Sequence, residues 1–158
     1  MKEIIVISRG PEATVSLGKG IGALLKPPDV VSLFGDFGSG KTCLIQGIVR
    51  GLGGSDEEYV RSPGYTLMNQ YVGKVPIFHF DLFRINDLSE IEELNLEGYF
   101  YDDGVTVIEW AEKIHPLLPI NRLDIRLVII GEKEREITLI PRAIEHLFSL
   151  HSQISMAT

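Results

Sequence analysis

Residues 35–42 read GDFGSGKT, which places glycines, a lysine and a threonine at the spacing GxxxxGK followed by Ser or Thr. The glycines let the backbone curl so that successive N–H groups point inward, an arrangement that binds phosphate oxygens. Lys41 would contact the β- and γ-phosphates, and the hydroxyl of Thr42 would bind Mg²⁺. The start of the following helix would add partial positive charge. The segment therefore predicts a phosphate-binding loop, although a glycine-rich turn that carries a chance lysine is the alternative.

Two acidic residues end apolar runs and are candidates for the second acid that a phosphate loop needs near its magnesium. Asp81 ends VPIFHFD, and Glu109 ends VTVIE. Glu109 follows the more apolar run, so we expect Thr42 and Glu109 to bind the metal. Asp81 would orient water or support the metal ligands. With Lys41, the two acids form the predicted catalytic set, unless either is a solvated carboxylate at a strand end.

Three further side chains are interpreted as structural. Trp110 follows Glu109 directly and would point to the opposite face of a strand, which favours a packing role. His79 lies inside an apolar strand and is interpreted as a hydrogen-bonded core histidine. Cys43 lies just inside the helix after the loop, where packing is favoured over a reactive thiol. The four histidines and one cysteine show no zinc spacing.

The elements that must position these residues alternate between apolar runs and helical periodicity. Helices are predicted over 12–25, over Thr42–Leu52 and from Ser89, as N-cap, to about Leu96. The predicted strands are Ile4–Ile7, Val30–Phe34, Tyr65–Val72, Val75–Leu82, Val105–Ile108, Leu123–Ile130 and Arg135–Ile140. This order predicts the α/β class: a P-loop NTPase-like single domain with a mixed parallel and antiparallel sheet and few helices.

The predicted domain covers residues 1–140, and residues 141–158 form a C-terminal tail, expected to be helical in part. In the tail, Ile144, Leu147 and Phe148 are expected on one face. The chain has 158 residues, which fits one domain of ordinary size.

Composition excludes several function classes. Fifteen Lys and Arg against 22 Asp and Glu give a formal charge of −7, which argues against stand-alone nucleic-acid binding. One cysteine cannot form an internal disulfide, so a reducing compartment is expected. The sequence shows no membrane span and no signal-peptide pattern. We therefore expect a cytoplasmic protein.

The nucleotide is expected to be ATP. No Asp is followed by Gly three residues later, so the GTPase switch motif is absent. Asn121–Asp124 resembles a guanine-reading motif but precedes its predicted strand, whereas such loops follow one. A small-molecule kinase fits the length, yet Arg122, Arg126 and Arg135 alternate with apolar residues and are expected on strands, which argues against a mobile lid. An ATP-binding adaptor that does not hydrolyse remains a second alternative.

Several motifs together resemble the bacterial TsaE (also called YjeE) family, the ATPase component of the machinery that makes threonylcarbamoyladenosine in tRNA. They occur in family order over about residues 8–140. The matching segments are GDFGSGKT at Gly35–Thr42, SPGYTL at Ser62–Leu67, HFDLFRI at His79–Ile85, ELNLEGYF at Glu93–Phe100 and VIEWAEK at Val107–Lys113.

The resemblance implies a magnesium-dependent ATPase. Thr42 and Glu109 would bind Mg²⁺, and Asp81 would be an additional catalytic carboxylate. Ser62–Thr66 would be a nucleotide-sensing switch. The phosphate contacts it implies are Gly38, Ser39, Gly40, Lys41, Thr42 and Cys43, and the stretch near Glu12–Leu17 would approach the adenine side, with Glu12 as the candidate contact. Arg135 is a further candidate nucleotide contact.

The implied partners are TsaB and TsaD homologues, of which TsaD transfers the threonylcarbamoyl group to adenine 37 of tRNA. The tRNA would be reached only through this complex, and ATP hydrolysis would reset the complex between turnovers. Three positions depart from the family pattern. Gly64 stands where Thr is usual, Phe83 where Tyr is usual, and Cys43 where a second Thr follows the lysine.

Overall fold

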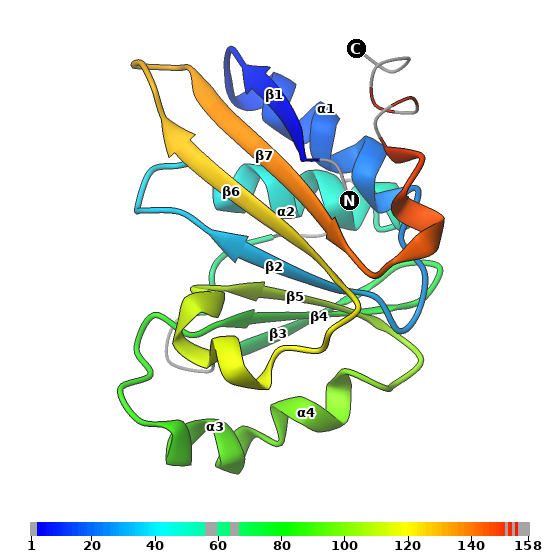
Figure 1. Ribbon diagram of the computed structural model, residues 1–158, viewed down its shortest axis with the longest axis vertical. Coiled ribbons are helices and arrows are strands. Elements are labelled where there is room, and N and C mark those ends of the chain that lie inside the picture. The colour runs from blue at the N-terminus through cyan, green and yellow to red at the C-terminus, as the bar shows by residue number, and fades with distance from the viewer. Residues whose placement is uncertain (1–2, 56–59, 64–66, 151, 153, 155–158) are drawn as a thin grey trace.

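The computed structural model describes residues 3–55, 60–63, 67–150, 152 and 154, and a mixed β-sheet forms its middle layer (Figure 1). The strand order is β1-β7-β6-β2-β5-β4-β3. Strands β6, β2, β5 and β4 are mutually parallel, whereas the β1–β7, β7–β6 and β3–β4 pairs are antiparallel. The strands are β1 Ile4–Ser8, β2 Val30–Phe34, β3 Met68–Val72, β4 Pro76–Asp81, β5 Val105–Glu109, β6 Arg122–Ile129 and β7 Arg135–Arg142. The expected α/β class with a mixed sheet is confirmed.

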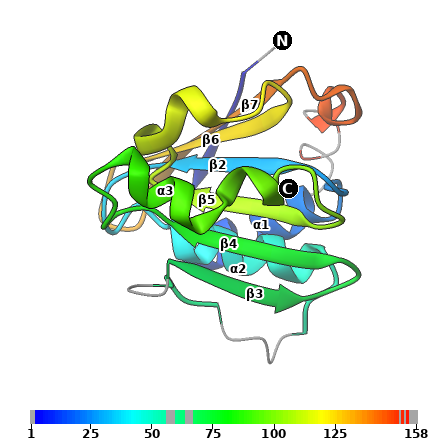
Figure 2. The same ribbon diagram turned by 90° about the horizontal axis from the view of Figure 1, so that it is seen from below.

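Longer helices cover one face of the sheet and shorter helices cover the other (Figures 1 and 2). The helices are α1 Pro11–Gly22, α2 Lys41–Gly51, α3 Leu88–Leu94, α4 Leu96–Tyr99 and the 3-10 helices η2 Ala111–Leu117 and η3 Glu145–Leu147. α1 and α2 pack on one face, around a core that includes Leu44, Ile48 and Val107. α3, α4 and η2 lie on the other face, around a second core that includes Phe80 and Ile108. Within the described residues, no helix is long and apolar enough to cross a membrane.

Glycines bring α1 and α2 into backbone contact. A Cβ added at Gly18 would lie 2.3 Å from the carbonyl oxygen of Leu44, and one added at Gly47 would lie 2.1 Å from that of Val15. A Cβ added at Gly20 would have no neighbouring atom within 4 Å. Glycines in a helix weaken it, by about 0.5–1 kcal/mol each relative to Ala. Here close packing explains Gly18 and Gly47, and it does not explain Gly20.

The acidic helix differs from its prediction in two details. Asp87, not Ser89, is the N-cap of α3: its carboxylate accepts a hydrogen bond of 3.0 Å from the backbone N–H of Ser89. Aspartate suits this position because its oxygen satisfies an N–H that the helix leaves unpaired. The helix also ends at Leu94, because Asn95 adopts a left-handed conformation (φ 51°) and α4 starts after it.

The C-terminal segment packs against the sheet. β7 continues to Arg142, two residues beyond its predicted end, so the proposed boundary after residue 140 falls inside a strand. Ile144 and Leu147 are buried, whereas Phe148 is 54% exposed, so these three side chains do not share one buried face. The Nε2 atom of His146 lies 2.7 Å from the Asp29 carboxylate, which joins η3 to the start of β2. The described part of this segment therefore belongs to the same core as β1, β7 and α1, through Ile144, Leu147, Leu150 and Ile154.

Candidate functional site

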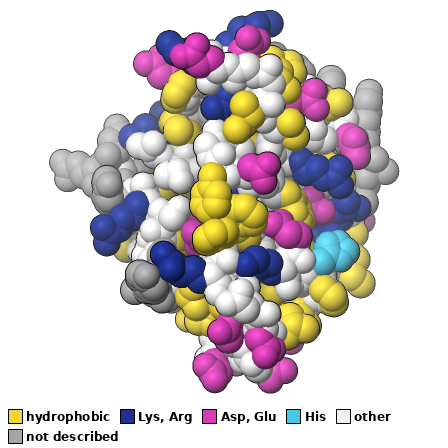
Figure 3. Space-filling view, turned by 90° about the vertical axis from the view of Figure 1, so that its left-hand side faces the viewer, with side chains coloured by type: hydrophobic (Ala, Val, Ile, Leu, Met, Phe, Trp, Pro, Cys, Tyr) yellow, Lys and Arg dark blue, Asp and Glu magenta, His cyan; other side chains and the backbone are white. Residues whose placement is uncertain are grey.

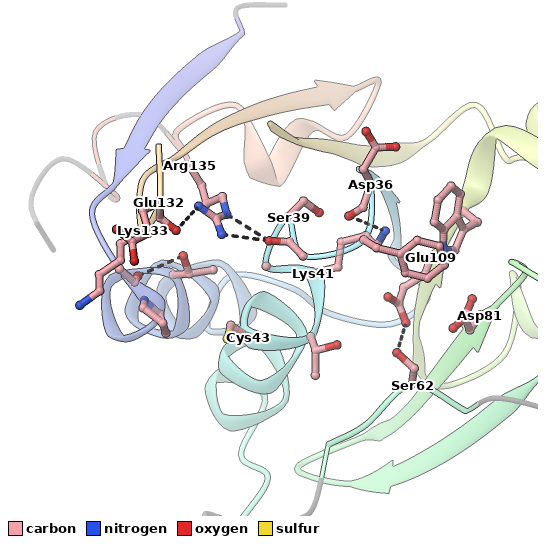
Figure 4. Close-up of a pocket in the computed structure, with 18 residues that line it drawn as sticks. Asp36, Ser39, Lys41, Cys43, Ser62, Asp81, Glu109, Glu132, Lys133 and Arg135 are labelled. Atoms are coloured by element: carbon pink, nitrogen blue, oxygen red, sulfur yellow. Dashed lines mark hydrogen bonds between the residues drawn. The ribbon is translucent and has the colours of Figure 1, made fainter. Parts of the chain in front are cut away.

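The loop between β2 and α2 forms the floor of a pocket of about 380 Å³ (Figure 4). Gly38 and Gly40 have φ values of 78° and 101°, in the region that only glycine adopts without strain. The Ser39 hydroxyl is buried, and the described residues offer it no hydrogen-bond partner. An unsatisfied buried hydroxyl beside a curled backbone fits a loop built to surround an anion.

Lys41 is the first residue of α2, and its side chain is buried. Its ammonium group donates to the carbonyl oxygen of Gly35 and, at 3.4 Å, to that of Asp36. It also lies 4.2 Å from the centroid of the Trp110 ring. Burial is the main cause that lowers the pKa of Lys41, and nearby carboxylates, first Glu109, oppose this shift. The lysine therefore lies at the pocket floor, close to the loop that it is expected to serve.

The two predicted acids meet at the pocket because β4 and β5 are parallel neighbours. Asp81 lies opposite Glu109 in the register, so both side chains leave the same face at the same edge of the sheet. Glu109 is buried, and its Oε2 atom lies 2.7 Å from Nε2 of His79. Burial raises the pKa of Asp81, the N–H of Phe83 opposes this by donating to its carboxylate, and the charge of Glu109 adds to the rise. A cation bound beside Asp81 would oppose this rise, because a nearby positive charge favours the ionised carboxylate.

Ser62 connects the predicted switch segment to Glu109. Its hydroxyl lies 3.5 Å from Oε2 of Glu109, and both residues line the pocket. Figure 4 shows the two side chains pointing toward each other. The rest of this prediction, including the Gly64 departure, concerns residues 64–66, which lie outside the described residues.

Arg135 lines the pocket from the first position of β7. Its guanidinium donates to the carbonyl of Gly38, at 3.2 Å from Nε and 3.0 Å from Nη2. Nη1 donates to the carbonyls of Gly131, Glu132 and Glu134 in the β6–β7 turn. These contacts make it a clamp between the turn and the phosphate loop. If Arg135 contacts a nucleotide directly, it must do so with N–H groups that already donate to these carbonyls.

The start of α1 forms another wall of the pocket, but Glu12 does not take part in it. Gly10, Pro11 and Thr14 line the pocket, whereas Glu12 is exposed and outside the lining. Thr14 faces inward because it lies on the buried side of α1, where its hydroxyl lies 2.7 Å from that of Ser8. The family resemblance implied the approach of the stretch near Glu12–Leu17, which contains Thr14, whereas Gly10 and Pro11 were not expected.

Sequence reasoning missed four other residues that line the pocket, which come from two segments. Lys133 and Glu132, in the β6–β7 turn, line the pocket almost a hundred residues after the phosphate loop. Asp36 and Phe37, inside the loop motif, also line it. The variable positions of the motif gave no reason to select Asp36 or Phe37. Because the β6–β7 turn is far from the phosphate loop in sequence, its own residues do not indicate that it will lie beside that loop.

Trp110 packs as expected, but in an aromatic cluster at the pocket and not on the opposite face of a strand. β5 ends at Glu109, and Trp110 takes a left-handed conformation (φ 58°), so strand alternation does not apply to it. Its ring lies 5.3 Å from that of Phe37 and 5.2 Å from that of Phe83, centroid to centroid, and the two phenylalanines are 4.7 Å apart. Phe37 is 66% exposed and Phe83 is 42% exposed. Hydrophobic side chains gather at the centre of the face shown in Figure 3, with charged groups around them.

The donors present fit a magnesium ion held jointly with a nucleotide. Thr42 and Cys43 lie in the first turn of α2 and line the pocket with Glu109 and Asp81. Among the described residues, no group of three or more His, Cys, Asp or Glu side chains could hold a metal by itself. Magnesium in phosphate sites takes one or two carboxylate or hydroxyl ligands and completes its shell with water and phosphate oxygens. Thr42 and Glu109 supply this kind of incomplete set.

Comparison with known proteins assigns the family. A family model described as threonylcarbamoyl adenosine biosynthesis protein TsaE matches residues 8–137. The chain belongs to the TsaE family. The family relation confirms the resemblance expected from the motifs.

Individual relatives agree with this assignment. A Bacillus subtilis protein named tRNA threonylcarbamoyladenosine biosynthesis protein TsaE is 40% identical over 139 residues, covering 87% of this chain and 85% of that protein. A Treponema pallidum protein of the same name is 35% identical over 133 residues, covering 84% and 97%. The crystal structure of YdiB from Bacillus subtilis superposes with a TM-score of 0.78 at 31% identity, covering 99% of this chain and 97% of that one. The fold is thus that of a P-loop nucleotide-binding family, as predicted.

Proposed function

We propose that this protein is a magnesium-dependent ATPase that assists homologues of TsaB and TsaD in forming N6-threonylcarbamoyladenosine at adenine 37 of tRNA. Hydrolysis would reset that complex between turnovers. The observation that carries the proposal is the meeting of Lys41, Thr42, Asp81 and Glu109 at one pocket, in a chain of the TsaE family. The relatives' names add the pathway, since both describe tRNA threonylcarbamoyladenosine biosynthesis.

Each residue has a role that follows from its position. The backbone N–H groups of the loop and Lys41 would bind the phosphate oxygens, and Lys41 would offset charge that develops as the γ-phosphate leaves. Thr42 and Glu109 would hold magnesium, which supplies charge neutralisation and orientation of the phosphates when bound. Asp81, at the same edge of the sheet, would orient the attacking water. Arg135 would keep the β6–β7 turn against the loop.

The pocket supports slow turnover by the protein alone. Among the described residues that line it, the cations are Lys41, Lys133 and Arg135, and Arg135 donates to backbone carbonyls. An arginine supplied by a partner can accelerate phosphoryl transfer by about 10³–10⁵-fold. The exposed rings of Phe37 and Phe83 beside the pocket are suited to contact such a partner, because aromatic side chains are enriched in protein interfaces. With a net charge of −7, contact with tRNA would run through the partners.

A calorimetric titration tests the nucleotide and metal roles. Nucleotide should bind the wild-type protein more tightly with Mg²⁺ than without it. Lys41→Ala should weaken binding strongly both with and without Mg²⁺, whereas Glu109→Ala should mainly remove the effect of Mg²⁺. A Glu109→Ala variant with unchanged metal dependence would reject the metal role of Glu109.

A turnover assay tests the catalytic role. ATP hydrolysis should be slow for the isolated protein and faster with the assembled TsaB and TsaD homologues. Full speed in isolation would contradict partner stimulation. ATP that stays intact in a single turnover of the assembled complex would favour a non-hydrolysing adaptor, and phosphate found on a small acceptor would favour a kinase.

A further inference from the structure

A chain of hydrogen bonds leads from Glu109, at the end of β5, past His79 on β4 to Tyr71 on β3. Nε2 of His79 lies 2.7 Å from Oε2 of Glu109, and Nδ1 of the same ring lies 2.9 Å from the hydroxyl of Tyr71. The Tyr71 hydroxyl in turn lies 3.2 Å from the carbonyl oxygen of Arg61. His79 is fully buried, and Glu109 and Tyr71 are 2% and 3% exposed. The Tyr71 hydroxyl has one proton to donate, either to Nδ1 of His79 or to the Arg61 carbonyl, and it lies within hydrogen-bond distance of both. These contacts connect a buried carboxylate with the backbone of the segment Val60–Pro63.

The sheet register explains why these groups meet. His79 and Asp81 point to the same face of β4, and Glu109 points to that face from the end of β5. Tyr71 reaches His79 from β3, the antiparallel neighbour on the other side. Asn69, opposite His79 in that register, donates to the same Arg61 carbonyl at 3.0 Å. Three strands therefore each supply one or two members of the chain.

The direction of the first bond follows from chemistry. An ionised carboxylate only accepts hydrogen bonds, so His79 donates its Nε2–H to Glu109. Both hydrogen bonds from described side chains to this carboxylate, from His79 and Ser62, go to Oε2. Oε1 is thus the oxygen left for a metal ion or its water. A polar contact that orients a metal ligand in this way commonly raises metal affinity.

We infer that His79 and Tyr71 are positioning residues that hold the Glu109 carboxylate and tie its orientation to the backbone of Arg61. The inference rests on the proposed metal role of Glu109. It adds that a change at Glu109 on nucleotide binding is transmitted through the sheet to Val60–Pro63, in addition to the direct contact of Ser62. His79, which the sequence presents as an ordinary core histidine, thereby acts on the site without touching nucleotide.

Two variants of His79 separate positioning from simple packing. His79→Gln places an amide N–H near the position of Nε2 and can still donate to Glu109. His79→Asn places its amide near Nδ1, on the side of Tyr71, and loses the donor to Glu109. Tyr71→Phe keeps the ring and removes only the hydroxyl that reaches Arg61. Tyr99→Phe, on the other face of the sheet against Phe78 and Phe80, is the matched control.

The first readout is the ratio of ADP dissociation constants without and with Mg²⁺, measured by calorimetry. The wild-type and Tyr99→Phe proteins should show the same ratio. His79→Asn should reduce the metal's contribution by roughly 10- to 100-fold, as for other groups that orient metal ligands, and His79→Gln should restore most of it. An unchanged ratio in His79→Asn, or equal losses in the two variants, would overturn the inference. If Mg²⁺ does not change the ADP affinity of the wild-type protein, the proposed function is refuted instead.

The second readout is hydrogen–deuterium exchange of the peptide that contains Val60–Ser62, with and without ADP and Mg²⁺. Ligand should slow this exchange in the wild-type protein, and Tyr71→Phe should reduce the slowing while nucleotide still binds, since Asn69 and Ser62 keep their own contacts. Equal slowing in the two proteins would overturn the connection to Arg61. If His79→Asn does not fold, His79→Gln and Tyr71→Phe still decide the matter: the first must retain the metal ratio and the second must show reduced slowing.

Discussion

The contact between α1 and α2 allows a paired test of how the pocket walls are held. We predict that Gly47→Ala destabilises the protein and that Gly20→Ala, in the partner helix, stabilises it. The same substitution is made in both cases, and only the surroundings differ. A Cβ at Gly47 would lie 2.1 Å from a backbone oxygen of Val15, whereas one at Gly20 has nothing within 4 Å.

The magnitude follows from these distances. To restore an ordinary contact of 3.4 Å at Gly47, the helices must separate by roughly 1 Å, which weakens dispersion along the whole contact. Overpacking of a tight contact costs about 1–3 kcal/mol, and the better helix propensity of Ala returns about 0.5–1 kcal/mol. Because the opposing atom is backbone, no side-chain rotation relieves the clash. We expect Gly47→Ala to lose about 1–2 kcal/mol and Gly20→Ala to gain about 0.5–1 kcal/mol in free energy of unfolding.

Urea unfolding followed by circular dichroism measures both changes. At about 2–4 °C per kcal/mol for a chain of this size, Gly47→Ala should also lower the melting temperature by about 2–8 °C. The first turn of α1 lines the pocket, so the same variant should bind nucleotide more weakly. A Gly47→Ala protein as stable as the wild type would refute the close-packing argument. A destabilised Gly20→Ala protein would show that something other than packing requires that glycine.

Three further changes test the pocket itself. Lys41→Met should weaken ATP binding in calorimetry by roughly 10- to 150-fold, because a charge-assisted hydrogen bond contributes about 1.5–3 kcal/mol; an unchanged affinity would exclude a phosphate contact. Burial raises the pKa of Asp81, so stability in the metal-free protein should fall as pH rises from the unfolded-state pKa through the folded-state pKa. Asp81→Asn should remove that fall and give a higher urea midpoint at pH 7, with the difference vanishing toward about pH 4; a difference independent of pH would contradict this. Arg135→Met should speed hydrogen exchange at Gly131–Glu134 and weaken nucleotide binding, whereas unchanged exchange would reject the clamp.

Much of the fold could be predicted because the relevant signals are local. The apolar run of β2, the glycine turn and the periodic start of α2 encode backbone conformation within a few residues of each other. The strands predicted at Leu123–Ile130 and Arg135–Ile140 are confirmed as β6 and β7 for the same reason. One predicted detail was wrong although its signal is also local. Asp87 and Ser89 are both good N-cap residues, and in the structure Asp87 is the N-cap of α3.

The sequence by itself determined the strand–loop–helix that holds Lys41 and Thr42, since spacing alone specifies a curled loop before a helix. It also placed Asp81 and Glu109 at the ends of apolar strands. Only the tertiary structure decided that β4 and β5 lie side by side, which brings these acids together. The same holds for the clamp of Arg135 on Gly38, 97 residues earlier, for the contact of His79 with Glu109, and for the closeness of α1 and α2. Such contacts depend on which distant segments pack together, and the energy of that packing is shared across the whole core, so no short stretch of sequence records it.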